Sequence, residues 1–136
     1  MKDVAYIALG SNMGDREKFL ADARDGLKVI PDSRIVAESS IEETAPIGPS
    51  GQGAYLNQMI ALETTLTPHA LLAHLHHLEV AAGRVRRERW GPRTLDLDIV
   101  KFDAQTVNAS DLRVPHPELE NRDFWQRELA ELRRGG

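Results

Sequence analysis

Apolar residues along this chain recur with two different periods, and the period changes at turn-forming residues. Short apolar or alternating runs indicate β-strands, whereas apolar residues that recur every three or four positions indicate helices. The runs follow the order strand, helix, strand, strand, helix, strand. We predict strands at 4–9, 34–43, 55–66 and 95–102, and helices at 15–30 and 68–82.

Residues that begin and end helices support these boundaries. Pro31 ends the first helical pattern, because proline lacks a backbone N–H and clashes inside a helix. Thr67 is placed to cap the second helix, with Pro68 at its first position and Gly83 just beyond its end. Between the second and third strands, residues 45–54 are rich in proline and glycine, which indicates a long loop.

This order of elements is typical of the ferredoxin-like βαββαβ plait, an α+β fold. We expect an antiparallel sheet with both helices packed on one face, and the first and last strands side by side in its centre. Residues 113–117 form an extended segment fixed by proline. We also expect an extra C-terminal helical segment at about 121–134, whose apolar positions are Phe124, Trp125, Leu129 and Leu132.

Composition narrows the class of protein. A length of 136 residues suits one domain, 1–136, with a real hydrophobic core. The chain has no cysteine, which excludes disulfides and thiolate metal sites and fits a reducing compartment. No apolar run could span a membrane, no signal-peptide pattern begins the chain, and the net charge is −4. We therefore expect a cytoplasmic protein that binds neither membrane nor nucleic acid, and we also expect it to be a monomer.

Two acids in the last strand are the sharpest sign of chemistry. Asp96 and Asp98 alternate with Leu95, Leu97 and Ile99, so both carboxylates project from one face of the strand. Adjacent carboxylates repel each other, and a hard cation such as Mg²⁺ relieves that repulsion by taking oxygen ligands. The alternative is an exposed strand face that carries two acids without a ligand.

A run of arginines precedes the acidic strand: Arg84, Arg86, Arg87, Arg89 and Arg93. The guanidinium group suits phosphate oxygens by its charge and its planar donor fork. Acids that hold metal beside arginines that hold phosphate indicate phosphoryl-type transfer from a nucleotide. No glycine-rich phosphate-binding motif is present, so metal and arginines would have to hold the phosphates. A solvated basic loop is the alternative.

Three further features leave alternatives open. His74 and His77 share a helix face and could bind a transition metal, although no cysteine or acid completes a ligand set at the right spacing. Glu79 lies near the arginine run and is either functional or simple surface charge. Trp90 is either a core aromatic residue or a cover over a planar ligand.

The whole pattern resembles the 6-hydroxymethyl-7,8-dihydropterin pyrophosphokinase family of folate biosynthesis. The residues from Arg89 to Val100 are similar to that family's signature, and the similarity extends in family order from about residue 4 to 124. Five other segments carry it, namely those that begin with Ala5-Tyr6-Ile7-Ala8, Thr44-Ala45-Pro46, Tyr55-Leu56-Asn57, Val114-Pro115-His116-Pro117 and Asn121-Arg122-Asp123-Phe124.

The resemblance implies a reaction in which the pterin hydroxymethyl oxygen attacks the β-phosphorus of ATP, pyrophosphate is transferred and AMP leaves. Asp96 and Asp98 would hold two Mg²⁺ ions, and Arg84 and Arg93 would neutralise charge on the transferring group. The arginine loop would close over ATP. The implied ATP contacts are Glu79, Arg86, Trp90, Ile99, His116 and Arg122, and the implied pterin contacts are Thr44, Ile47, Tyr55, Asn57 and Phe124.

The chain departs from the family pattern in places. Asp111 and Glu118 stand where relatives have arginines, His76 stands where a relative has glutamine, and the tail is short and polar. Three rival functions remain at this stage: a different metal-dependent nucleotidyl transferase, a non-catalytic member of the family, and a small RNA-binding plait. The pterin-pocket residues argue against the first, the intact acidic pair against the second, and the net charge against the third.

Overall fold

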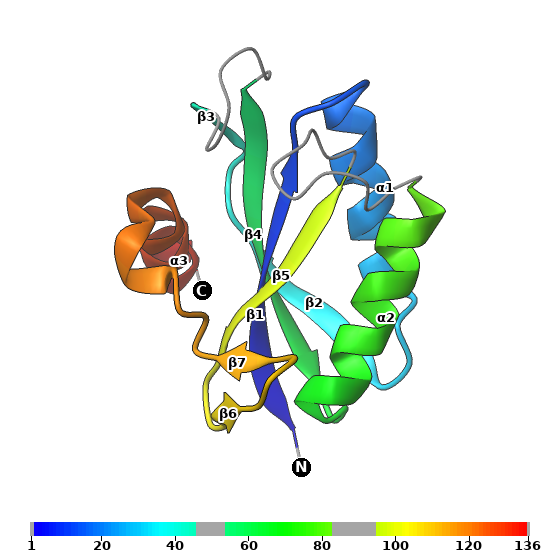
Figure 1. The fold of residues 1–136 in the computed structure, drawn as a ribbon, viewed down its shortest axis with the longest axis vertical. Coiled ribbons are helices and arrows are strands. Elements are labelled where there is room, and N and C mark those ends of the chain that lie inside the picture. The colour runs from blue at the N-terminus through cyan, green and yellow to red at the C-terminus, as the bar shows by residue number, and fades with distance from the viewer. Residues whose placement is uncertain (1, 46–53, 83–94, 136) are drawn as a thin grey trace.

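The computed structural model describes residues 2–45, 54–82 and 95–135 (Figure 1). Its strands are β1 (Asp3–Ser11), β2 (Ser33–Glu38), β3 (Glu42–Thr44), β4 (Tyr55–Thr64), β5 (Asp96–Phe102), β6 (Val107–Asn108) and β7 (Arg113–Val114). Its helices are α1 (Arg16–Lys28), α2 (Pro68–Ala81), the 3₁₀ helix η1 (Leu119–Asn121) and α3 (Asp123–Gly135). The predicted order of the main elements and the α+β class are confirmed.

The main sheet is antiparallel, and its strands lie in the order β2-β4-β1-β5. The first and last main strands, β1 and β5, are neighbours as predicted. The expectation that both lie in the centre is wrong, because β5 ends the row of described strands and β4 and β1 occupy its middle. An edge strand has one row of backbone groups that no neighbouring strand pairs. Groups in this row of β5 can therefore bond to side chains of other elements around the site.

The strand predicted at 34–43 is two strands, β2 and β3, and both pair with β4. The pairing changes at Ser39, whose hydroxyl accepts a hydrogen bond of 2.8 Å from the Met59 backbone N–H. Ser40 then turns toward α3, where Glu131 accepts hydrogen bonds from its backbone N–H at 2.6 Å and its hydroxyl at 2.8 Å. The break depends on residues far away in sequence, so alternation along the strand did not predict it.

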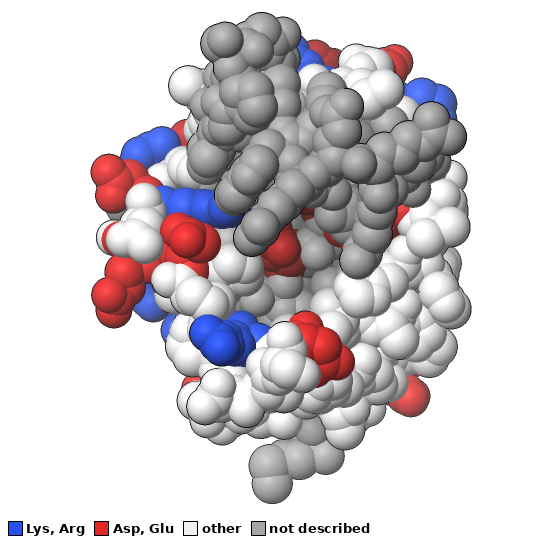
Figure 2. Space-filling view, viewed as in Figure 1, with Lys and Arg blue, Asp and Glu red and all other residues white. Residues whose placement is uncertain are grey.

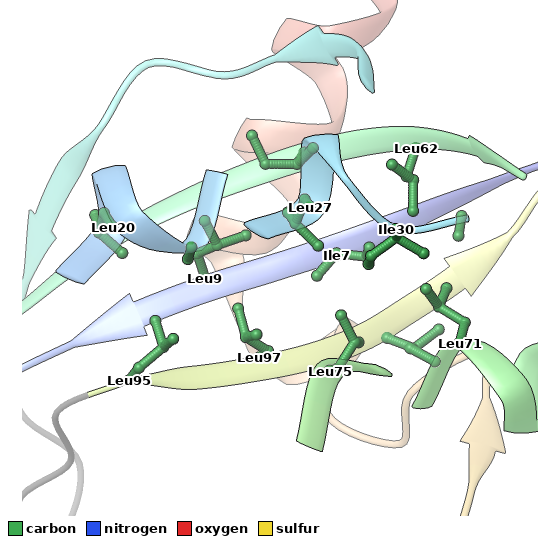
Figure 3. Packing of buried hydrophobic residues seen from close by; sticks show 14 of the residues in the cluster. Ile7, Leu9, Leu20, Leu27, Ile30, Leu62, Leu71, Leu75, Leu95 and Leu97 are labelled. Atoms are coloured by element: carbon green, nitrogen blue, oxygen red, sulfur yellow. The ribbon is translucent and has the colours of Figure 1, made fainter. Parts of the chain in front are cut away.

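Helices α1 and α2 cover one face of the sheet, as predicted (Figure 1). The side chains of Asp15 and Thr67 cap them by accepting hydrogen bonds from backbone N–H groups in the first turn. Figure 3 shows the core between helices and strands, where Leu20 and Leu27 of α1 and Leu71 and Leu75 of α2 meet Ile7, Leu9, Leu62 and Leu97 of the strands. None of the described helices is long and apolar enough to cross a membrane.

The C-terminal helix α3 covers the opposite face (Figure 1). Its Trp125, which is 2% exposed, packs with Leu129 and Leu132 against a second, smaller cluster from the sheet. The sheet contributes Ala8, Met59, Ala61 and Val100. Burial of this apolar side of α3 supplies the driving force that holds the helix on the sheet. The predicted C-terminal helix is therefore present and packs as part of the fold.

Candidate active site

The two aspartates of β5 lie on the sheet face that α3 partly covers. Their neighbours Leu97 and Ile99 point into the core under α1 and α2, so alternation directs Asp96 and Asp98 to the other face. Both residues are half-buried. The structure therefore gives the acidic pair the shared orientation that its spacing predicts.

Pairing across the sheet aligns Asp96 with a residue of the predicted pterin pocket. Gly10 in β1 is opposite Asn57 in β4 on one side and opposite Asp96 in β5 on the other. Neighbouring strands are about 4.8 Å apart, so Asn57 and Asp96 are separated by about 10 Å across a glycine that has no side chain. In the next row, Ala8 lies between Met59 and Asp98. Small residues on β1 thus leave space between the acids and Asn57.

A hollow of about 380 Å³ lies at the edge strand β5. Figure 2 shows a recess on this face with acidic atoms inside it. The hollow is lined by residues of α2, of β5 and of the segment that follows β6. The residues are Leu72, His76, Glu79, Asp96, Leu97, Asp98, Ile99, Ser110, Asp111, Leu112, Arg113, His116 and Pro117. Three of the predicted ATP contacts, Glu79, Ile99 and His116, are among this lining.

Glu79 is buried, with 4% of its surface exposed. Its Oε2 accepts a hydrogen bond of 2.8 Å from the backbone N–H of Leu97. This N–H belongs to the edge strand, so α2 supplies the acceptor that a further strand would otherwise provide. The alternative that Glu79 is simple surface charge is wrong, and its contact with a nucleotide stays a prediction.

His116 lies beside Asp98, with 4.0 Å between its Nε2 and Asp98 Oδ1. Burial lowers the pKa of His116, while the nearby carboxylate of Asp98 acts in the opposite direction. The Nδ1 of His116 accepts a hydrogen bond of 3.0 Å from the Glu118 backbone N–H. A neutral ring with Nδ1 as acceptor carries its proton on Nε2. The side of the ring near Asp98 therefore offers an N–H donor.

Trp125 forms an aromatic base beneath this region. The His116 ring meets it edge to face, with 5.0 Å between centroids. The Arg122 guanidinium lies over the same indole at 4.4 Å from the centroid, a cation–π arrangement. His116 and Arg122, both predicted to contact ATP, are thus held by one buried tryptophan.

The predicted pterin residues that the structure describes lie on β3, β4 and α3. Asn57 is buried, and its Nδ2 donates to Thr44 Oγ1 at 2.7 Å. A Cβ built on Gly10 would lie 3.4 Å from Cδ1 of Tyr55 and 3.6 Å from Oδ1 of Asn57. Phe124 lies in the first turn of α3, and its ring centroid is 6.1 Å from that of Trp125. Tyr55 and Asn57 therefore lie together next to Gly10.

Several predicted residues lie outside the described parts of the chain. These are Ile47, Arg84, Arg86, Trp90 and Arg93. The transition-metal alternative for His74 and His77 gains no support, because residues 2–45, 54–82 and 95–135 contain no group of three or more potential His, Cys, Asp or Glu ligands.

The structure also adds residues that sequence reasoning did not select. Arg113 lines the hollow at β5, and only its position at the start of the proline-fixed segment 113–117 could have suggested it. Asp111, noted as a departure, pairs with His69 at 3.0 Å, and this interaction lowers the pKa of its carboxyl. Gly10 lies just beyond the strand predicted at 4–9, and its importance follows from its place between Asn57 and Asp96.

Fold and site together define a class: a ferredoxin-like α+β domain with a polar, acidic site at its edge strand. The family model described as 7,8-dihydro-6-hydroxymethylpterin-pyrophosphokinase matches residues 6–134. The chain belongs to this family. It is an ATP-dependent enzyme that transfers pyrophosphate to the hydroxymethyl group of 6-hydroxymethyl-7,8-dihydropterin, giving AMP, in folate biosynthesis.

Three similar proteins share the name 2-amino-4-hydroxy-6-hydroxymethyldihydropteridine pyrophosphokinase. The protein of that name from Bacillus subtilis strain 168 is 42% identical over 132 residues, which cover 97% of this chain and 79% of the relative. That from Methylorubrum extorquens is 41% identical over 128 residues, covering 94% and 81%. That from Pseudomonas aeruginosa is 42% identical over 127 residues, covering 93% and 78%.

Proposed function

We propose that the family reaction takes place on the α3-facing side of the sheet, with ATP along β5 and the pterin beside Asn57. The alignment of Asn57, Gly10 and Asp96 across three strands carries this proposal. It leaves the pterin hydroxymethyl group and the triphosphate on the same face, separated by a residue without a side chain. Rigid strands of this kind hold two reactants in a productive orientation, which is a large part of catalysis for phosphoryl transfer.

Asp96 and Asp98 are the proposed ligands for two Mg²⁺ ions. Their half-buried carboxylates on one face of β5 offer the hard oxygen donors that Mg²⁺ prefers. Mg²⁺ typically uses one or two protein carboxylates, and substrate phosphates and water complete its coordination, so a pair of acids without further protein ligands fits. When bound, Mg²⁺ offsets charge on the phosphate oxygens and orients the triphosphate.

Glu79, His116 and Arg122 are proposed to organise the part of the site that binds ATP. Glu79 fixes the backbone of Leu97, the residue between the two aspartates, and so orients both carboxylates. His116 donates from Nε2 to a phosphate oxygen, and Arg122 adds positive charge from its position over Trp125. Ile99, Arg86 and Trp90 complete the proposed ATP contacts.

The pterin ring is proposed to bind between Tyr55 and Phe124, since flat heterocycles stack on aromatic side chains. Asn57, together with Thr44 and Ile47, reads the polar edge of the ring. Asn57 suits this role because its amide is held by Thr44 Oγ1 at 2.7 Å. Its orientation is therefore set before the ligand arrives, which lowers the entropic cost of binding.

Arg84 and Arg93 are the proposed catalytic residues. They stabilise negative charge that increases on the transferring group as the bond to the leaving AMP breaks. The remaining parts of the proposal are a single domain over 1–136, a monomeric state, a cytoplasmic location and no nucleic-acid partner.

Product analysis tests the proposal. The protein is incubated with ATP, Mg²⁺ and reduced hydroxymethylpterin, with each component omitted in turn. AMP that forms only in the complete mixture supports the proposal. Release of free pyrophosphate with a nucleotidylated acceptor would indicate a nucleotidyl transferase instead, and no turnover would indicate a non-catalytic member of the family.

A further inference from the structure

Glu128 of α3 is a buried acid that the proposed mechanism does not use. It is 3% exposed, and neither of its carboxylate oxygens has a hydrogen-bond partner within residues 2–45, 54–82 and 95–135. It lines a hollow of about 410 Å³ between α3 and the segment at β3, together with Ser40, Glu42, Arg127, Ala130 and Glu131. An unpaired carboxyl group is costly to bury, so its environment needs an explanation.

The other charged groups around Glu128 are already engaged. The Arg127 guanidinium Nη2 is 3.4 Å from each carboxylate oxygen of Glu42. Glu131 accepts both hydrogen bonds that Ser40 donates. The neighbour left for Glu128 is therefore the Glu42 carboxylate, which approaches from β3. Burial raises the pKa of Glu128 to about 9, and Glu42 and, to a smaller extent, Glu131 add to the rise, whereas Arg127 opposes it.

Glu42 connects this acid to the pterin pocket. Glu42 in β3 is paired across the sheet with Asn57 in β4. The Nδ2 of Asn57 lies 3.5 Å from the Glu42 backbone carbonyl and donates to Thr44 Oγ1, two residues further along β3, at 2.7 Å. The backbone of this three-residue strand thus orients the Asn57 amide, while its Glu42 side chain contacts α3.

We propose that Glu128 is a positioning residue for the pterin pocket, acting through Glu42 and β3 on the Asn57 amide. The neutral carboxyl lets α3 lie against Glu42 of β3 without adding a third negative charge to those of Glu42 and Glu131, which line the same hollow. Loss of its proton places a buried carboxylate beside the half-buried carboxylate of Glu42, with Arg127 shared between them. β3 then moves away from α3, and Thr44 and Glu42 no longer hold Asn57. The inference rests on the proposed function and adds a residue that controls it.

Steady-state kinetics between pH 7 and 9.5 test this inference. KM for the pterin and KM for ATP are measured in the wild type and in Glu128→Gln, with Glu17→Gln on the exposed side of α1 as the charge-matched control. If only the neutral form of Glu128 holds the pocket and its pKa is about 9, the wild-type KM for the pterin rises about fourfold over this range. KM for ATP is not expected to follow. Ionisation of the substrate itself affects every variant equally, so it cancels in the ratio of the wild-type KM to the variant KM at each pH.

Glu128→Gln keeps the shape of the side chain but cannot ionise. Once the effect of substrate ionisation is subtracted, its KM for the pterin should therefore change less than twofold between pH 7 and 9.5. Glu42→Gln removes the second charge and should also remove the alkaline rise, which keeps the test valid if Glu128→Gln does not fold. Parallel profiles for the wild type, Glu128→Gln and Glu42→Gln would overturn the inference alone. Absence of pterin-dependent AMP in the wild type at pH 7.5 would overturn the proposed function and the inference with it.

Discussion

The buried carboxylate of Glu79 accepts a hydrogen bond from the backbone N–H of Leu97, the residue between Asp96 and Asp98. A helix side chain therefore closes the open edge of the strand that carries the acidic pair. On the same strand, the carbonyl of Val100 accepts from the His116 backbone N–H at 2.7 Å. In the part of the chain that the structure describes, the outer side of the edge strand is thus held by Glu79 and by the His116 backbone and is not paired by another long strand.

Replacement of Glu79 tests that relationship. Glu79→Ala leaves the Leu97 N–H without its acceptor, and an unsatisfied buried donor costs about 1–3 kcal/mol in the free energy of unfolding. Glu79→Gln keeps an acceptor oxygen and should retain most of the stability. Urea unfolding measures both variants. Equal stability of Glu79→Ala and the wild type would mean that the hydrogen bond does not fix the strand.

The acidic pair is expected to be needed for turnover and dispensable for folding. Asp96→Ala and Asp98→Ala each remove an oxygen ligand, and the loss of metal-based charge stabilisation is worth several kcal/mol in the transition state. Rates of AMP formation should fall to near background, while circular dichroism and melting temperature stay close to the wild type. A near-normal rate for either variant at saturating Mg²⁺ would contradict the assignment.

Gly10→Ala is expected to leave pterin binding intact, whereas Gly10→Val is expected to weaken it. A Cβ would sit in ordinary contact with Tyr55 and Asn57, but the extra methyl groups of Gly10→Val would enter the space between Asn57 and Asp96. A clash of about 1.4 kcal/mol with the bound pterin corresponds to a tenfold loss of affinity, so KM for the pterin should rise about tenfold. The free energy of unfolding should fall by no more than about 1–3 kcal/mol, the usual cost of overpacking, and the preference of valine for strands partly offsets that cost. An unchanged KM in Gly10→Val would locate the pterin elsewhere.

Replacement of different arginines in the run that precedes β5 is expected to have different kinetic effects. Arg84→Ala and Arg93→Ala should lower kcat more than they weaken ATP binding, because charge increases on the transferring group only in the transition state. Arg87→Ala, which has no assigned contact, is the matched control and should be near neutral. Single-turnover kinetics separate the chemical step from binding. Variants that change only KM would assign these arginines to ATP docking.

Stability should depend on pH through Glu128. Its pKa is about 9 in the folded protein, against an ordinary value near 4.3 in an unfolded chain. Between these values the folded state binds more protons, so this group's contribution to stability is full at acid pH and is lost as pH rises toward about 9. Glu128→Gln should therefore raise the melting temperature at pH 8 and have little effect at pH 4. A shift of equal size at both pH values would contradict the raised pKa.

The sequence predicts much of this fold because most elements are defined by local patterns. Hydrophobic periodicity and the Asp15 and Thr67 caps need no distant partner, and the alternation around Asp96 and Asp98 fixes their common face wherever the strand lies. The break at Ser39 and Ser40 was not predictable in the same way, because it depends on Met59 in β4 and on α3.

Burial of charged residues was the other feature that local patterns did not predict. Glu79 and Glu128 both resemble surface residues in a helical pattern. One is buried because a strand backbone needs an acceptor, and the other because α3 packs against β3. Both reasons exist only once distant segments meet. The residue roles that come from family resemblance alone remain predictions for the experiments above.

The most direct test of the account follows single phosphorus atoms from ATP to products. ATP is labelled at the α- or the γ-phosphate and incubated with the protein, Mg²⁺ and reduced hydroxymethylpterin, and the products are separated. Attack at the β-phosphorus leaves the α-label in AMP and carries the γ-label into the pterin product. A γ-label in the pterin product accompanied by ADP, or an α-label in it, would contradict pyrophosphoryl transfer at this site.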